Sequence, residues 1–172
     1  AFPNGRGPLL SVDTFRAAVA EAALAAGAHW INDVSGGRRE PELLQVVAAA
    51  GCPYVLMHSR GDSRTMDQLA TYKAVTAEVG EELLRATERA VAAGVNTAQV
   101  IWDPGLGFAK TTEHNLTLVR ELSQLRAAGF PLLVGPSRKR FIGAVLEEPR
   151  PRARLWGTAA VSALAISQGA DV

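Results

Sequence analysis

A short apolar segment followed by a helical segment recurs five times along this 172-residue sequence, and no other feature constrains the fold as strongly. Alternating strand and helix patterns predict a parallel sheet that is covered by helices. The segments that we predict to be strands are residues 8–12, 29–31, 54–57, 100–102 and 131–134, and residues 170–172 look like the start of a sixth. The sequence therefore predicts an α/β fold, with residues 1–172 forming one domain.

The predicted helices lie between these strands, and glycines end several of them. We expect helices over residues 15–26, 41–50, 67–93, 112–129, 141–146 and 152–168. Thr14 is predicted to cap the first helix, and Pro41 suits the first turn of the second. Residues 1–7 are rich in Pro and Gly, which indicates a connecting segment.

The alternation alone does not distinguish an open doubly wound sheet from a TIM (β/α)8 barrel. No G-x-G-x-x-G follows the first predicted strand and the sequence has no Walker loop, which disfavours a nucleotide-binding sheet. A complete barrel usually needs about 250 residues, and five βα units cannot close one. We therefore predict a partial TIM barrel of about five βα units that lacks the first strands and the last.

The composition excludes several classes of protein. With 48% hydrophobic and 20% charged residues, the chain is globular rather than disordered. Eighteen basic and seventeen acidic residues leave a net charge of +1, which argues against a general nucleic-acid or membrane surface. Cys52 is the single cysteine, so an intramolecular disulfide is excluded. We recognise neither a signal peptide nor a membrane segment and expect a cytoplasmic protein.

Residues that could carry chemistry follow the predicted strands, and they are Asp13, Asn32, Met57 with His58, Asp103, and the turn at residues 135–140. In a barrel, the carboxyl ends of the strands meet at one mouth. Carboxylates and an amide together suit a flat heteroaromatic ligand that has several N–H donors. Met57 would lie against its ring, Lys139 would donate to it, and Arg140 could hold a carboxylate.

Each of these residues also has a purely structural interpretation. Asp13 could belong to a helix cap, Asn32 could hold a turn, and Asp103 before Pro-Gly could do the same. His58 is more typical of a hydrogen-bonded structural histidine than of a ligand or base. The basic run at residues 138–140 is typical of a solvated surface, and a methionine is more often core than site. The three histidines have no zinc-ligand spacing.

Five ordered motifs resemble the dihydropteroate synthase family, namely S-V-D-T at 11–14, I-N-D-V-S-G-G at 31–37, L-M-H at 56–58, D-P-G-L-G-F-A-K-T at 103–111 and S-R-K-R-F-I-G at 137–143. They cover nearly the whole chain, and Arg140 is similar to the actinobacterial members. The resemblance implies a TIM barrel and a transferase of folate biosynthesis that is the target of sulfonamides. Its reaction would join p-aminobenzoate to 6-hydroxymethyl-7,8-dihydropterin diphosphate, giving 7,8-dihydropteroate and pyrophosphate with Mg²⁺.

By this resemblance, the pterin-binding residues would be Asp13, Asn32, Met57, Asp103 and Lys139. Asp103 and Lys139 would be the catalytic pair. As pyrophosphate leaves, positive charge can build on the electron-rich pterin, and the Asp103 carboxylate would stabilise it while the aniline nitrogen attacks. No side-chain nucleophile is required.

The p-aminobenzoate site implied by the resemblance would include Phe108 and Arg140 beside Lys139. The family's Mg²⁺-binding Asn belongs to an N-terminal strand that this sequence does not contain, so no residue is assigned to a metal. A loop that closes over p-aminobenzoate is also outside it, as is the R-V-H-D-V strand that would begin at Asp171. We expect a homodimer at full length and expect this chain alone to be inactive.

Other interpretations remain open. A pterin-binding methyltransferase domain has a similar barrel, although the S-R-K-R and F-A-K-T segments favour the synthase. A non-catalytic homologue that binds only a pterin or a partner chain is a second alternative. A generic phosphate-binding barrel is the weakest.

Overall fold

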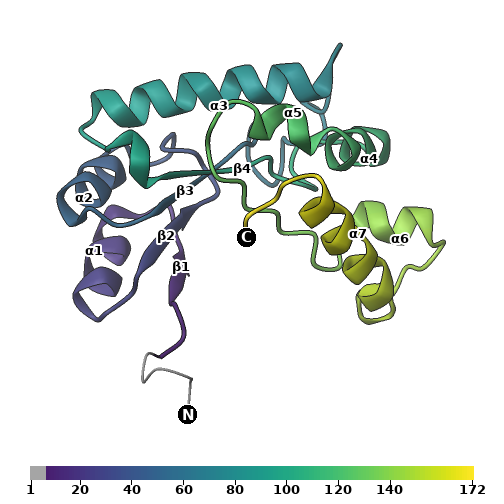
Figure 1. Ribbon diagram of the computed structural model, residues 1–172, viewed down its shortest axis with the longest axis horizontal. Helices are drawn as coiled ribbons and strands as arrows, with labels where there is room; N and C mark the ends of the chain where they lie inside the picture. Colours follow the sequence, from purple (N-terminus) through teal and green to yellow (C-terminus); the bar gives the residue numbers. More distant parts are fainter. Residues whose placement is uncertain (1–6) are drawn as a thin grey trace.

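The computed structural model describes residues 7–172, so residues 1–6 of the predicted connecting segment lie outside the described residues (Figure 1). The first half contains β1 (Ser11–Asp13), α1 (Ala17–Ala25), β2 (Trp30–Asp33), α2 (Glu42–Ala50), β3 (Tyr54–Met57) and α3 (Val75–Ala92). The second half contains η2 (Thr97–Gln99), β4 (Val100–Asp103), α4 (Thr112–Arg120), α5 (Leu122–Arg126), α6 (Arg140–Val145), η3 (Pro151–Arg154) and α7 (Leu155–Ser167).

The four strands form a parallel sheet in the order β1-β2-β3-β4, which is also their order along the chain. In a doubly wound sheet the order of the strands reverses at a switch point, whereas in a barrel each new strand is added beside the previous one. The sequential order therefore confirms the predicted partial TIM barrel. The sheet is open within the described residues, with β1 as its first strand.

Residues 131–134 were predicted to be a full fifth strand, but they form only a bridge between Leu132 and Trp102. The backbone bonds nevertheless continue the ladder, because the N–H of Trp102 donates to Pro131 and the N–H of Leu133 donates to Trp102. On the other side, Asp171 and Val172 donate to the carbonyl of Leu132. These segments thus lie where a fifth and a sixth strand would lie.

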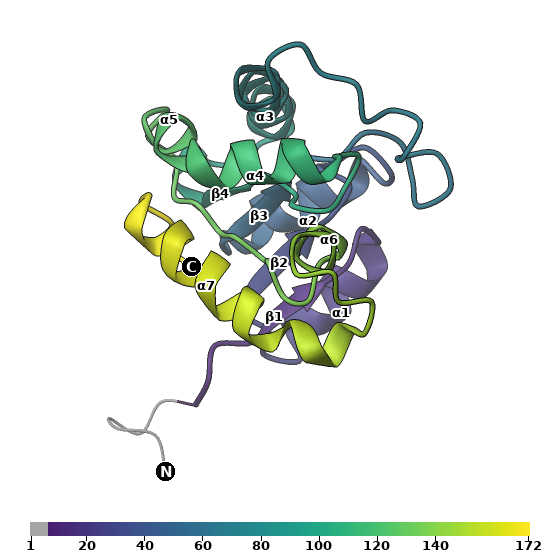
Figure 2. The same cartoon turned by 90° about the vertical axis from the view of Figure 1, so that its right-hand side faces the viewer.

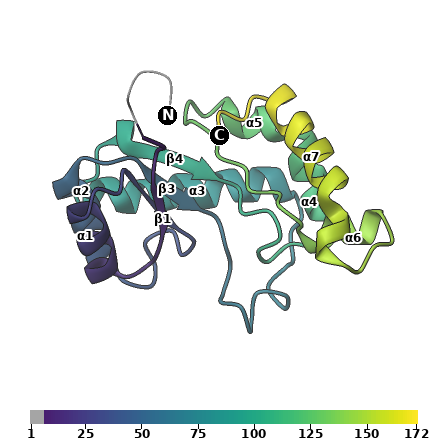
Figure 3. The ribbon, with the colours of Figure 1, turned by 90° about the horizontal axis from the view of Figure 1, so that it is seen from below.

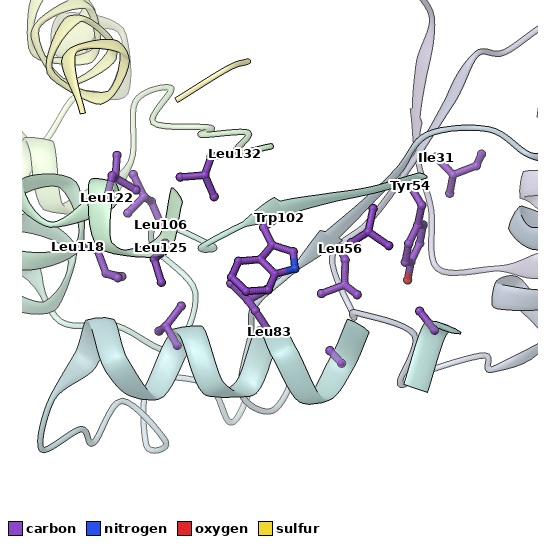
Figure 4. Packing of buried hydrophobic residues seen from close by; sticks show 14 of the residues in the cluster. Ile31, Tyr54, Leu56, Leu83, Trp102, Leu106, Leu118, Leu122, Leu125 and Leu132 are labelled. Atoms are coloured by element: carbon purple, nitrogen blue, oxygen red, sulfur yellow. The ribbon is translucent and has the colours of Figure 1, made fainter. Parts of the chain in front are cut away.

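The hydrophobic core lies between the sheet and its helices. Figure 4 shows Leu56 and Trp102 from the strands facing Leu83 of α3, and all three are almost fully buried. The indole N–H of Trp102 donates to Thr87 Oγ1 at 2.9 Å, which satisfies the one polar atom of this buried ring. Cys52 is also buried. None of the helices within residues 7–172 combines the length and apolarity that crossing a membrane requires.

The helix predicted from Asp67 begins only at Val75, so that prediction was wrong by two turns. The Glu78 carboxylate accepts from the N–H groups of Lys73 and Ala74 and so caps the helix there. Before it, the Asp62 side chain accepts from the N–H of Arg64 and of Thr65 and fixes turns instead. Residues 58–74 therefore form a long loop that extends away from the sheet (Figures 2 and 3).

Other helix boundaries also differ from the prediction. The helix predicted over residues 112–129 breaks at Glu121 into α4 and α5, where the Glu121 carboxylate accepts from Thr76 of α3 at 2.7 Å. Thr14 was predicted to cap the first helix, but α1 begins at Ala17, whose N–H donates to Glu40 at 2.8 Å. A carboxylate distant in sequence therefore does the capping, which local patterns cannot reveal.

Candidate functional site

The strand register places Asp13, Asn32, Met57 and Asp103 on one face of the sheet. Asp13 lies beside Asn32, and Met57 lies beside Asp103. Asn32 is in line with Val55, two residues before Met57, and side chains alternate along a strand. All four therefore point away from the helix-covered core. Asn32 Nδ2 lies 3.4 Å from Asp13 Oδ2.

Asp103 is the buried charge of this face, with 6% of its surface exposed. Burial raises the pKa of its carboxyl to about 6, while the N–H of Gly105 and the positive charges of Lys110 and Lys139 act in the opposite direction. The N–H of Gly105 donates to Asp103 Oδ1 at 2.7 Å. The carboxylate is therefore ionised at neutral pH and held by its own turn.

Lys139 provides the positive charge for both carboxylates. Burial lowers the pKa of Lys139, and the negative charges of Asp103 and Asp13 oppose that shift. The pKa of Asp13 is raised by burial and then by Asp33, and Lys139 again opposes the shift. Lys139 Nζ also lies 4.3 Å from the centre of the Phe108 ring, a cation–π contact. The structure thus brings Lys139 together with the two predicted acids and with Phe108.

Asn32 leaves an acceptor unused at this face. Its Oδ1 is buried and has no hydrogen-bond partner among the described residues. A buried carbonyl oxygen without a partner costs about 1–3 kcal/mol, so native proteins rarely leave one. The geometry therefore favours a ligand that supplies an N–H donor at this point.

The turn after Asp103 depends on two glycines. Gly105 has φ +67°, and a Cβ there would lie 1.9 Å from the backbone oxygen of His58. Gly107 has φ +80°, and its N–H donates to Asn115 Oδ1 of α4 at 2.7 Å. These contacts fix the turn between β4 and α4, and they determine where both Asp103 and Phe108 lie.

Phe108 and Arg140, both predicted for one site, line different cavities. Phe108 lines a cavity of about 320 Å³ together with Met66 and Arg39. Arg140 lines another of about 340 Å³, and its exposed guanidinium pairs with Asp67 of the long loop at 2.8 Å. Arg140 is thus bound to this loop rather than to Phe108.

Four residues that hold the site together were not predicted, namely Asp33, Glu82, Lys110 and Arg154, whereas the interpretation of His58 as a hydrogen-bonded structural histidine is confirmed. The buried Asp33 carboxylate accepts from the N–H groups of Ser35 and Gly37 and from Tyr54 Oη, and so shapes the turn after Asn32. His58 is buried between Glu82 and Lys110. Arg154 donates to the carbonyl of Arg138 at 3.1 Å, which fixes the turn that carries Lys139.

These groups carried different signals in the sequence. Asp33 and Lys110 lie inside the I-N-D-V-S-G-G and F-A-K-T segments, so they could have been found. Nothing local marks Glu82 or Arg154 as partners of the site.

A metal site is not apparent in the described part of the chain. Residues 7–172 contain no group of three or more His, Cys, Asp or Glu side chains that could hold a metal ion. No described residue is therefore assigned to a metal, and no chemical step below involves one.

Comparison with known proteins identifies the family. The model of the family described as "Pterin binding enzyme" matches residues 4–172. The dihydropteroate synthase of Synechocystis sp. is 49% identical over 163 residues, which cover 95% of this chain and 56% of that protein. The chain therefore spans little more than half the length of this relative.

Solved structures give the same result. The structure of a Xanthomonas albilineans dihydropteroate synthase with 4-aminobenzoic acid is 41% identical to this chain and has a TM-score of 0.87. The matched region covers 94% of this chain and 57% of the Xanthomonas chain. The structure of a Yersinia pestis dihydropteroate synthase in a sulfonamide drug complex is 38% identical and has a TM-score of 0.90. The matched region covers 96% of this chain and 60% of the Yersinia chain.

Proposed function

Because the chain belongs to the family of pterin-binding enzymes, we propose that it forms the pterin-binding part of a dihydropteroate synthase. The reaction would condense p-aminobenzoate with 6-hydroxymethyl-7,8-dihydropterin diphosphate to give 7,8-dihydropteroate and pyrophosphate. The relatives named above support the activity.

One observation carries the choice of ligand: Asn32 Oδ1 has no hydrogen-bond partner among the described residues and shares its face of the sheet with the Asp13 and Asp103 carboxylates. Three side-chain acceptors on one face suit a flat ring that has several N–H donors, and a pterin has such a ring. Met57 lies next to Asp103 in the register and would contact the ring face. The acids would bind N–H groups, and Lys139 would donate to a ring carbonyl or nitrogen.

Asp103 would stabilise the positive charge that develops during the reaction. When the bond between the methylene carbon and the diphosphate oxygen breaks, the electron pair leaves with pyrophosphate and positive charge spreads into the ring. A preorganised carboxylate lowers the free energy of that state. The amine nitrogen of p-aminobenzoate then bonds to the methylene carbon and loses a proton.

In this proposal, Phe108 would pack against the ring of p-aminobenzoate, and Arg140 would bind its carboxylate. Arg140 would have to release Asp67, and that ion pair is exposed and therefore weak. Sulfonamides would compete for the same place.

Three further predictions from the sequence stay predictions. Mg²⁺ would be held by residues other than those described. Homodimer formation finds support in the exposed apolar side chains of α7, which include Trp156 and Ile166. A cytoplasmic location still depends on the sequence alone.

Calorimetric titration with 6-hydroxymethylpterin tests the proposal. We expect one molecule bound per chain, with affinity that falls as the pH drops through about 6, because protonation of Asp103 removes an acceptor and a charge. Absence of binding would contradict the proposal.

A second titration, with a sulfonamide, separates the synthase from a pterin-binding methyltransferase. Pterin binding without any sulfonamide binding would favour the methyltransferase or a non-catalytic homologue.

A further inference from the structure

The side chain of Lys110 is buried against the turn at residues 103–108, with 7% of its surface exposed. Its Nζ donates to the carbonyl of Gly105 at 3.1 Å and to that of Phe108 at 3.0 Å. It also lies 2.9 Å from Nδ1 of His58. When the amine is protonated it has three donors, and these three contacts use all of them.

His58 connects Lys110 to the helix behind the sheet. Burial lowers the pKa of His58 to about 4, so the imidazole is neutral at neutral pH and can accept a hydrogen bond. Because Lys110 donates to Nδ1, the ring proton is on Nε2, which lies 2.9 Å from Glu82 Oε2. Glu82 is in turn bound by Arg60, with 3.0 Å between Nε and Oε1. The position of the lysine is therefore fixed from α3.

Gly105 links this network to the candidate site. Its carbonyl accepts from Lys110, and its N–H donates to the Asp103 carboxylate. The second carbonyl that Lys110 holds belongs to Phe108, whose ring contacts Lys139. We propose that Lys110 is a positioning residue, which fixes the turn so that Asp103 faces the bound pterin while Phe108 faces the p-aminobenzoate beside it. This inference rests on the proposed function.

The charges of Lys110 and Asp103 also affect one another. Burial lowers the pKa of Lys110 to about 7, and the negative charge of Asp103 opposes that shift. In the same way, Lys110 opposes the rise of the Asp103 pKa. An uncharged side chain that only packed the turn would have no such electrostatic effect, so the Lys110→Met substitution provides a test.

In Lys110→Met, we expect pterin affinity at neutral pH to fall about tenfold, and the pH midpoint of binding to move upward by about one unit, because Asp103 loses a neighbouring cation. Lys73→Met, the same change at an exposed position, should alter neither value. Calorimetry over a pH series measures both. A folded Lys110→Met protein with the affinity and midpoint of the wild type would overturn the proposal. A loss of stability alone, with the midpoint unmoved, would also overturn it.

A ligand-free measurement keeps the proposal testable if Lys110→Met does not fold. In Asp103→Asn, the pKa of Lys110 should fall below about 7, since the neighbouring negative charge is removed. NMR titration of the lysine ¹³Cε signal reports this pKa. An unchanged value would overturn the proposal. If the wild type binds no pterin, the proposed function fails, and the pKa measurement still decides whether Lys110 and Asp103 are coupled.

Discussion

Asp103→Asn should weaken binding of 6-hydroxymethylpterin by about tenfold to a hundredfold, because a charge-assisted hydrogen bond contributes about 1.5–3 kcal/mol. The amide has the shape of the carboxyl and keeps an oxygen for the N–H of Gly105, so the turn should persist. The variant should also be no less stable at neutral pH than the wild type, since burial disfavours the ionised carboxylate. Calorimetry gives the affinity and thermal unfolding gives the stability.

The sign of the stability change follows from the raised pKa of Asp103. The carboxyl stabilises the folded state at pH values below the pKa that it has in the unfolded chain. This contribution is lost as the pH rises through about 6, the pKa of the carboxyl in the folded protein. Removing the charge should therefore help most above that pH. Glu88→Gln, which removes an exposed carboxylate from α3, serves as the control and should leave binding unchanged. Equal affinity of Asp103→Asn and the wild type would place the pterin elsewhere.

Gly105→Ala should be the most destabilising single change in the site, lowering the free energy of unfolding by more than about 3 kcal/mol. A Cβ would lie 1.9 Å from the backbone oxygen of His58, and no side-chain rotation can relieve that clash. The positive φ adds strain of about 1–2 kcal/mol. Because the turn carries Asp103 and Phe108, pterin binding should be lost as well.

Gly27→Ala is the matched control for this prediction. Gly27 also has a positive φ, of +97°, but nothing lies within 4 Å of the position of its Cβ. Gly27→Ala should therefore lose only the free energy of the backbone strain, about 1–2 kcal/mol. Chemical denaturation of both variants separates strain from steric clash. Equal losses in the two variants would mean that the turn adapts, which would contradict the tight contact between Gly105 and His58.

Much of the architecture could be predicted because it depends on the local pattern of apolar and polar residues along the chain. Apolar runs such as residues 54–57 and 100–102 lie in buried strands, and glycines follow the helices before them. Parallel strands in sequence order then place Asp13, Asn32 and Asp103 on one face without further information. The register gathers the four predicted pterin-binding residues that lie on strands, whereas Lys139 is brought to them by the turn before α6.

What could not be predicted depends on contacts between distant segments. The start of α3 at Val75 is set by the Glu78 cap, and the break at Glu121 coincides with a hydrogen bond from Thr76. Burial of Lys110 and its contact with His58 require the tertiary structure. Arg140 was predicted to hold the carboxylate of p-aminobenzoate, and in the structure it pairs with the carboxylate of Asp67 in the long loop.

An experimental structure of the chain with a bound pterin tests the account most directly. We predict that the ring lies against Met57, with one N–H group within hydrogen-bond distance of Asn32 Oδ1 and another at the Asp103 carboxylate. A ring bound elsewhere, for example in the cavity beside Met66, with Asn32 Oδ1 still unpartnered, would contradict the claim that these strand ends form the pterin site.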